Sequence, residues 1–215
     1  MKRRIVLLGP PAAGKGTQAE MIAAKFGIPS VSPGACFRSE IEAGTELGRD
    51  AELVTRQGKL VPDEMACKIV AGWLVGHNGE FVFDGFPRSL GQAKTLEAML
   101  VTRKTPLDAA ILLEVDFETI SNRVMRRAAC LKCRGIVSIG MHVANAETPC
   151  PRCGGKLAQR ADDNLEALRS RMEEYKEKTE PLVDHYRSRG LLRVVDSNRP
   201  PEMVFAAMSG ILEGQ

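Results

Sequence analysis

The chain has 215 residues, of which 44% are hydrophobic and 27% are charged. These are average values for a globular domain, and they exclude disordered and fibrous proteins. A net charge of +3, from 30 basic and 27 acidic residues, is too small for bulk nucleic-acid binding but is compatible with a local site for an anion. The first apolar run, residues 5–8, is shorter than the ~7–15 residues of a secretory signal, and no run approaches a membrane span of ~18 residues. We therefore expect a cytoplasmic protein whose thiols stay reduced.

Short apolar runs rich in β-branched residues predict strands at 5–8, 81–83, 109–115 and 191–195. Helical stretches separate them, so the pattern indicates an α/β fold in which helices cover both faces of a parallel sheet. The longest predicted helix begins near Asn164 and carries an apolar stripe from Leu165 to Tyr186. Pro181 should bend or interrupt this helix, because proline cannot donate the backbone hydrogen bond.

Two segments depart from the α/β alternation and read as insertions into the core. Residues 33–62 predict short helices at 36–42 and 46–57, with Gly44 and Gly58 as turns and no strand between them. Residues 124–159 contain four cysteines and little core-forming periodicity. The core is then expected to consist of residues 1–32, 63–123 and 160–215.

A phosphate-binding loop follows the first predicted strand. The residues from Gly9 to Thr17 match G-x-x-x-x-G-K, with a helical run after them. In such a loop the backbone N–H groups and the helix N-terminus face phosphate oxygens, while Lys15 reaches the terminal phosphates. Gly16 directly follows Lys15 and Thr17 comes one position later, so the usual magnesium-binding hydroxyl is displaced.

Gly14-Lys15-Gly16-Thr17-Gln18 is joined downstream by Asp84-Gly85-Phe86-Pro87-Arg88 and Gln92. Together these residues resemble the adenylate kinases, and further matches cover essentially the whole chain. They are Gly34 with Arg38, the stretch 58–61, Arg123 with Arg127, the stretch 159–164, and Arg171. The resemblance implies a P-loop nucleotide kinase in which the insertion 33–62 binds the nucleoside monophosphate and the insertion 124–159 is a lid over ATP.

The resemblance implies reversible transfer of a phosphoryl group from MgATP to AMP, giving two ADP. Such a transfer needs positioning and charge neutralisation more than covalent chemistry, and arginine forks suit phosphate oxygens. No general base is needed, because the AMP phosphate, with a second pKa of about 6, is already mostly dianionic at pH 7. His77, His142 and His185 are accordingly assigned to surface or packing roles.

The implied catalytic residues are Lys15, Asp84, Arg88, Arg123, Arg160 and Arg171. Those implied for ATP are Gly9, Pro11, Ala12, Ala13, Gly14, Lys15, Gly16, Thr17, Arg123, Arg127 and Arg199. Those implied for AMP are Pro33, Gly34, Arg38, Lys59, Val61, Gly85, Arg88 and Gln92.

Two C-x-x-C pairs, Cys130 with Cys133 and Cys150 with Cys153, have the spacing of a four-thiolate zinc site. All four ligands are protein sulfurs, so the spacing predicts a structural Zn²⁺ with no open position for chemistry. A segment shorter than ~40 residues usually needs such a staple, and the zinc-ribbon-like lid matches the long-form adenylate kinases. Two disulfides or a redox pair are the alternatives, and iron can replace zinc at thiolate sites.

The chain departs from the family pattern in two places. It has Ser32-Pro33-Gly34-Ala35 where Ser-Thr-Gly-Asp is common, so a hydroxyl near the base is missing. Ala12 also replaces a common glycine, which is tolerable unless the backbone there has a positive φ. Kinases of UMP, CMP or GMP, and a nucleic-acid-binding zinc-ribbon NTPase, remain as alternative functions. We expect ATP, AMP and ADP as ligands, a monomer, and no nucleic-acid or membrane partner.

Overall fold

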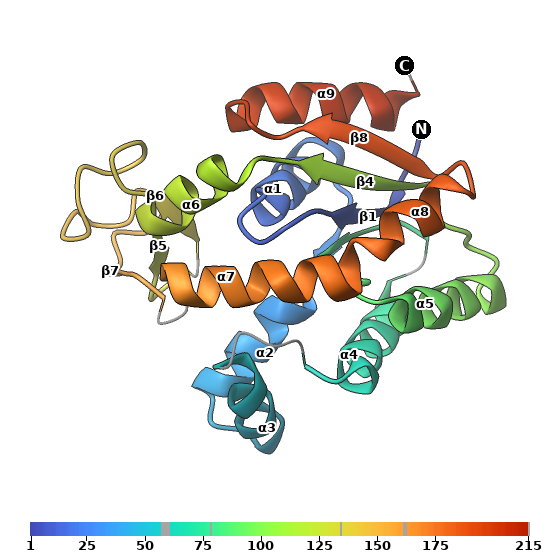
Figure 1. Cartoon of the computed structure of the whole chain (residues 1–215), viewed down its shortest axis with the longest axis horizontal. Helices are drawn as coiled ribbons and strands as arrows, with labels where there is room; N and C mark the ends of the chain where they lie inside the picture. Colours follow the sequence, from blue (N-terminus) through green and yellow to red (C-terminus); the bar gives the residue numbers. More distant parts are fainter. Residues whose placement is uncertain (57–60, 78, 134, 161–162, 215) are drawn as a thin grey trace.

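The computed structural model describes residues 1–56, 61–77, 79–133, 135–160 and 163–214. Its centre is a five-stranded sheet in which every pairing is parallel (Figure 1). The order across the sheet is β2 (Ser30–Val31), β3 (Phe81–Asp84), β1 (Arg4–Leu8), β4 (Ala109–Glu114) and β8 (Leu192–Asp196). The four predicted strands are confirmed to within a residue at each end. The two-residue β2 was not predicted, because so short a strand has no pattern of its own.

Alternate strand residues enter two separate cores. Val6 and Leu8 pack against one set of helices, whereas Ile5 and Leu7 pack against another. The first set contains α4 (Asp63–Gly76), α5 (Leu90–Thr102) and α8 (Pro181–Arg187), and the second contains α1 (Lys15–Phe26) and α9 (Pro201–Glu213). This confirms the predicted sheet with helices on both faces (Figure 1).

The first insertion forms a helical hairpin. It consists of α2 (Pro33–Glu42) and α3 (Glu46–Thr55), joined at Gly44 with φ +64°. A Cβ at Gly48 would lie 2.1 Å from Glu40 O, so glycine permits the close approach of the two helices. Helix α2 begins three residues earlier than predicted because Pro33 occupies its first turn, where the missing N–H costs nothing. Gly58 lies outside the described residues.

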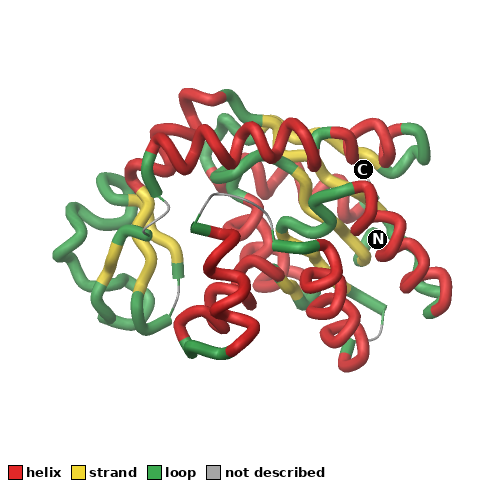
Figure 2. The backbone as a smooth tube through the Cα atoms, turned by 60° about the horizontal axis from the view of Figure 1, so that its bottom comes forward, coloured by secondary structure: helices red, strands yellow, loops and turns green. Residues whose placement is uncertain are grey.

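The second insertion forms a small antiparallel sheet of its own, set apart from the main sheet (Figure 2). Its strands are β5 (Arg127–Cys130), β6 (Ile136–Ser138) and β7 (Leu157–Ala158), in the order β6-β5-β7. Its core contains few apolar side chains: the buried residues are Ala128, Cys130, Val137, Val143, Cys150 and Leu157.

Helices α6 (Phe117–Arg126) and α7 (Leu165–Glu174) connect the small sheet to the core, and they pack on each other through Ile120, Val124 and Leu168. Helix α7 continues through a π-helical turn, η1 (Tyr175–Thr179), into α8. The Glu180 N–H donates to Tyr175 O (2.9 Å) directly before Pro181. The predicted interruption at Pro181 is confirmed, and its form is a π turn. Within the described residues, none of the helices has the length and apolar character needed to span a membrane.

Candidate active site and metal centre

The phosphate loop connects β1 to α1, at the carboxyl edge of the sheet. Gly9 (φ +137°) and Gly14 (φ +96°) have left-handed backbones, and a Cβ at Gly9 would lie 2.7 Å from Leu113 O. The Lys15 Nζ donates to Gly9 O and Pro10 O, both at 2.8 Å. The ammonium group is therefore folded over the loop.

Lys15 is surrounded by other cations. Burial lowers the pKa of Lys15 to about 7; Asp84 opposes this shift, and the guanidinium groups of Arg88, Arg171 and Arg127 reinforce it. Three guanidinium groups, from the β3–α5 connection, α7 and the small sheet, thus act on the Lys15 ammonium group. Such a concentration of positive charge is suited to a polyanion.

Asp84 ends β3 and faces the start of α1. Gly16 stands at the position after the lysine, where the motif usually has a hydroxyl residue. A Cβ there would lie 3.3 Å from Asp84 Oδ2, so the Asp84 carboxylate occupies the space beside it. This explains why the chain has glycine there. Thr17 is exposed, one residue further along α1. Carboxylate oxygens are the ligands that Mg²⁺ prefers, commonly through bound water, and Asp84 is suitably placed for that role.

Ala12 has φ +58°. From the sequence we expected alanine to be tolerated here unless the backbone had a positive φ. The backbone is left-handed, so Ala12 is strained by about 1 kcal/mol or more. The loop is braced from behind by Ser197, whose Oγ donates to Ala13 O (2.6 Å). The Arg123 guanidinium donates to Ser197 O (2.6 Å) and approaches Ala13 O (3.4 Å), and burial lowers the pKa of Arg123.

Two of the arginines predicted for AMP converge on Gly34. A Cβ at Gly34 would lie 3.4 Å from Arg38 Nη1 and 3.5 Å from Arg88 Nη2. Burial, followed by repulsion from Arg171, lowers the pKa of Arg88 to about 10. The Arg88 Nε donates to Gly85 O (2.7 Å). These two guanidinium groups, from α2 and from the β3–α5 connection, form a second cationic site beside Lys15.

The Gln92 side chain is 2% exposed and is hydrogen-bonded at both ends. Its Oε1 accepts from the Arg88 N–H (2.7 Å), and its Nε2 donates to Asp63 Oδ1 (2.7 Å). Ser89 donates to Asp63 Oδ2 (2.5 Å) and caps α5 by accepting from the Gln92 N–H (3.1 Å). The Gln92 amide, which the family resemblance assigns to AMP, is thus held in place by Asp63.

The remaining predicted arginines lie in three places: Arg127 begins β5, Arg160 follows β7, and Arg199 lies between β8 and α9. Arg127 forms a bidentate pair with Asp163, whose side chain is fully buried. Arg160 lies in the returning segment, where its carbonyl accepts from the Asp163 N–H (3.0 Å). Arg199 is exposed and pairs with Asp196 (3.0 Å), while its carbonyl lies 3.5 Å from Arg123 Nη2. Lys59 lies outside the described residues.

The four paired cysteines come together at the tip of the small sheet. Their Sγ atoms all lie within 4.8 Å of one another, with Cys130 to Cys153 at 3.5 Å and Cys133 to Cys150 at 3.7 Å. A tetrahedron with Zn–S bonds of about 2.3 Å has edges of about 3.8 Å, so the spacing fits a four-thiolate metal ion. The N–H groups of Lys132 and Cys133 point at Cys130 Sγ, both at 3.4 Å, which favours a thiolate. Gly155 packs against this sulfur, because a Cβ there would lie 2.9 Å from it.

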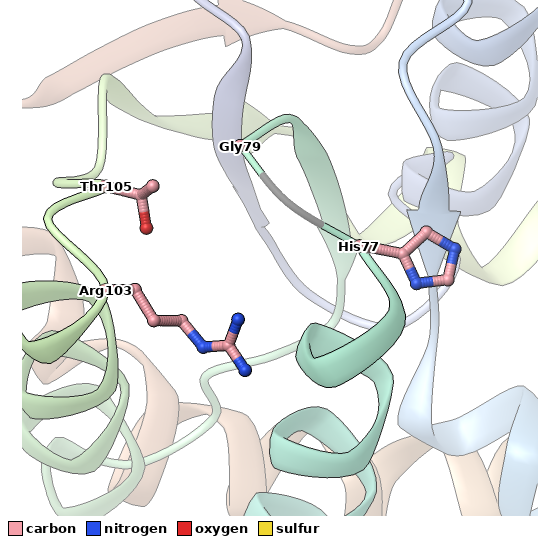
Figure 3. A pocket seen from close by; sticks show the side chains of 4 residues that line it. All are labelled: His77, Gly79, Arg103 and Thr105. Carbon is pink, nitrogen blue, oxygen red and sulfur yellow. The ribbon is translucent and has the colours of Figure 1, made fainter.

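Two cavities lie at opposite ends of the strands of the main sheet. One of about 480 Å³ is lined by Val54, Val61, Pro62, Asp63, Ser89, Gly91 and Lys178, between the helical insertion and α5. The other, of about 290 Å³, is lined by His77, Gly79, Arg103 and Thr105 (Figure 3). Gly79 and Thr105 precede β3 and β4, so this second cavity is remote from the phosphate loop. Val61 is the residue predicted for AMP that lines the first cavity.

The histidines have local packing roles in the structure. His77 stacks on Trp73 (3.8 Å between ring centroids), His142 accepts from the Ser138 N–H (2.9 Å), and His185 pairs with Glu97 (2.8 Å). Cys36 and Cys67 are free thiols that pack in the core, as expected of small hydrophobic residues.

Sequence reasoning missed Asp63, Ser89 and Ser197. Ser89-x-x-Gln92 matches the capping-box pattern, which would have placed Gln92 at the start of a helix with its side chain turned back. Asp63 and Ser197 carry no such signal, because their partners are 29 and 184 residues away.

Comparison with known proteins agrees with this geometry. The adenylate kinase family profile matches residues 7–191. An adenylate kinase from Agathobacter rectalis is 43% identical over 97% of this chain and 99% of its own length. Adenylate kinases from Thermodesulfovibrio yellowstonii and Archaeoglobus fulgidus are 39% and 40% identical over 98% and 97% of this chain, and over 99% and 97% of their own lengths. With the match running through the phosphate loop, the arginine cluster and the cysteine cluster, this chain belongs to the adenylate kinase family.

Proposed function

We propose that the protein transfers the γ-phosphoryl group of ATP to AMP, reversibly, to give two ADP. The observation that carries the proposal is that Lys15 Nζ lies over the phosphate loop, where the charges of Arg88, Arg171, Arg127 and Asp84 all act on it. The AMP phosphate oxygen forms a bond to the γ-phosphorus while the bond to the β-phosphate oxygen breaks. No proton has to move, because the AMP phosphate is mostly dianionic at pH 7.

The residues divide between two nucleotides. The loop residues Gly9 to Thr17, with Arg123, Arg127 and Arg199, bind ATP, and Arg160 and Arg171 neutralise the transferring group. Arg38 and Arg88 hold the phosphate of AMP, while Pro33, Gly34, Lys59, Val61, Gly85 and Gln92 surround its sugar and base. Asp84 orients Mg²⁺, which accompanies ATP and offsets charge on its phosphates.

Residues 33–62 act as the AMP-binding part and residues 124–159 as the lid, with the remaining segments as the core. A lid closed over ATP excludes the water that would otherwise accept the phosphoryl group. Cys130, Cys133, Cys150 and Cys153 hold a structural Zn²⁺ that keeps the lid rigid. Four reduced thiols suit the cytoplasm. Since one chain supplies both nucleotide sites, we propose a monomer without nucleic-acid or membrane partners.

The test is ADP formation from ATP with AMP, UMP, CMP or GMP as acceptor. We expect AMP to exceed the others at least tenfold, and Arg88→Ala to lower kcat/KM for AMP by about 100-fold, as for other groups that stabilise transition-state charge. Arg187→Ala, an exposed arginine paired with Asp184, is the control and should stay within twofold. Equal turnover of UMP and AMP, or an unaffected Arg88→Ala enzyme, would contradict the proposal.

A further inference from the structure

We propose that Asp63 is a positioning residue for base selection, which holds the Gln92 amide in the one orientation that accepts adenine and rejects 6-oxopurines. The proposal deepens the proposed function and rests on it, since it assumes that the base of AMP meets Gln92. Asp63 lies in the first turn of α4, and Gln92 lies in the first turn of α5.

The two partners of the Gln92 amide have opposite and fixed polarity. Asp63 Oδ1 accepts from Gln92 Nε2 at 2.7 Å, and the Arg88 N–H donates to Gln92 Oε1 at 2.7 Å. A carboxylate only accepts and a backbone N–H only donates. Rotating the amide by 180° would put oxygen against oxygen and N–H against N–H, so both bonds would be lost in a buried place. The network therefore fixes which end of the amide is oxygen.

Asp63 is itself held in place. Ser89 Oγ donates to Asp63 Oδ2 (2.5 Å), so each carboxylate oxygen has a defined partner. Gly91 leaves room for this approach, because a Cβ there would lie 3.0 Å from Asp63 Oδ2. The orientation of Gln92 is thus set by a rigid neighbour.

The fixed amide has one N–H and one oxygen lone pair left. Adenine carries an amino donor at position 6 beside a ring acceptor at N1, which complements an amide in this orientation. Guanine and hypoxanthine carry a carbonyl acceptor at position 6 beside an N1–H donor, so both contacts become repulsive. An inverted amide would accept these bases. Asp63 and the Arg88 N–H make that inversion costly, and the enzyme therefore selects adenine. The cavity of about 480 Å³ that Asp63 lines lies directly beside this network.

A purely structural role for Asp63 predicts a different result. The same amide holds the Arg88 N–H, and Thr179 Oγ1 donates to Arg88 O (2.8 Å), so loss of Asp63 could also disturb the phosphate site. That disturbance would reduce turnover of every monophosphate by the same factor. A change in the ratio between adenine and 6-oxopurine substrates is specific to the orientation mechanism.

The test compares AMP with inosine monophosphate, which has the inverted donor and acceptor pattern without the extra amino group of guanine. For Asp63→Asn, whose amide both donates and accepts, we expect the ratio of kcat/KM for AMP over that for inosine monophosphate to fall at least tenfold. The change should appear mainly in the KM of the monophosphate, with the KM of ATP unchanged. Asp184→Asn, at an exposed site paired with Arg187, is the matched control and should keep the wild-type ratio.

A second variant keeps the proposal testable if Asp63→Asn folds poorly. In the double variant Asp63→Asn with Gln92→Glu, the asparagine amide donates to the carboxylate at position 92, so the buried pair is kept, but the carboxylate only accepts. Each base then meets one matched and one repulsive contact, and the ratio of kcat/KM for AMP over that for inosine monophosphate should fall towards one. A ratio within twofold of wild type in the folded variants, with both substrates weakened equally, would overturn the proposal. Failure of the wild-type enzyme to use AMP would instead refute the proposed function.

Discussion

Binding of MgATP to this protein should be accompanied by proton uptake at Lys15. Burial lowers the pKa of Lys15 to about 7, so without a phosphate beside it about 90% of the Lys15 side chains should be neutral at pH 8. Phosphate oxygens beside the Nζ favour the charged form and should return the pKa to about 10. Binding then takes up about 0.9 proton per ATP at pH 8 and about 0.1 at pH 6. By linkage, affinity for ATP is highest below pH 7 and decreases by up to about tenfold per pH unit above it.

Calorimetric titration with MgATP, in two buffers of different ionisation enthalpy, measures this uptake directly. At pH 8 Arg88, with a pKa of about 10, is almost fully charged and the nucleotide phosphates are almost fully deprotonated, so neither contributes. Lys15→Arg carries a permanent charge and should bind ATP without proton uptake. Lys68→Arg, at an exposed position on α4, is the control and should behave as wild type. An uptake below about 0.2 proton at pH 8, or one that persists in Lys15→Arg, would refute the reasoning.

Two further predictions concern stability. Cys130→Ser should reduce the bound zinc below about one ion per chain, as measured by elemental analysis. If about half of ~10 kcal/mol of metal-binding free energy is lost, at ~2–4 °C per kcal/mol, the melting temperature should fall by roughly 10–20 °C. Cys36→Ser, outside the cluster, should keep the metal; zinc content unchanged by Cys130→Ser would show that the cluster is not its site. Ala12→Gly should raise the melting temperature by about 2–4 °C, because glycine removes about 1 kcal/mol of left-handed backbone strain. Ala13→Gly, which removes a fully buried methyl group, should lower the melting temperature, and a shift in the same direction for both variants would contradict the assigned strain.

Motifs with a fixed local geometry could be predicted from the sequence. The phosphate loop needs a strand, a glycine-rich turn and a helix in immediate succession, and Arg4 to Phe26 supply them in that order. The cysteine cluster is also local, because each C-x-x-C pair brings its two sulfurs together on one turn. The arginines were found by resemblance alone. A single arginine in a helix has no pattern that separates an active-site cation from a solvated one.

Contacts between segments far apart in the chain could not be predicted from the sequence. The strands of the small sheet have two to four residues, too few for a periodic signal. Strand β5 pairs with β6 about 10 residues further along the chain and with β7 almost 30 residues further along. Ala12 shows the same limit: the sequence identified the question of its φ, but only the folded loop sets the value at +58°.

The order of residues by itself determined the α/β class, the phosphate loop and the four sulfur ligands, since each depends on neighbours within a few positions. Tertiary structure decided that Arg38 and Arg88 meet at Gly34, that burial lowers the pKa of Lys15, and that Asp63 fixes the Gln92 amide. Hydrogen-bond polarity and desolvation depend on which groups are brought within about 3 Å, and segments far apart in the chain reach that distance only after the sheet and its helices have packed.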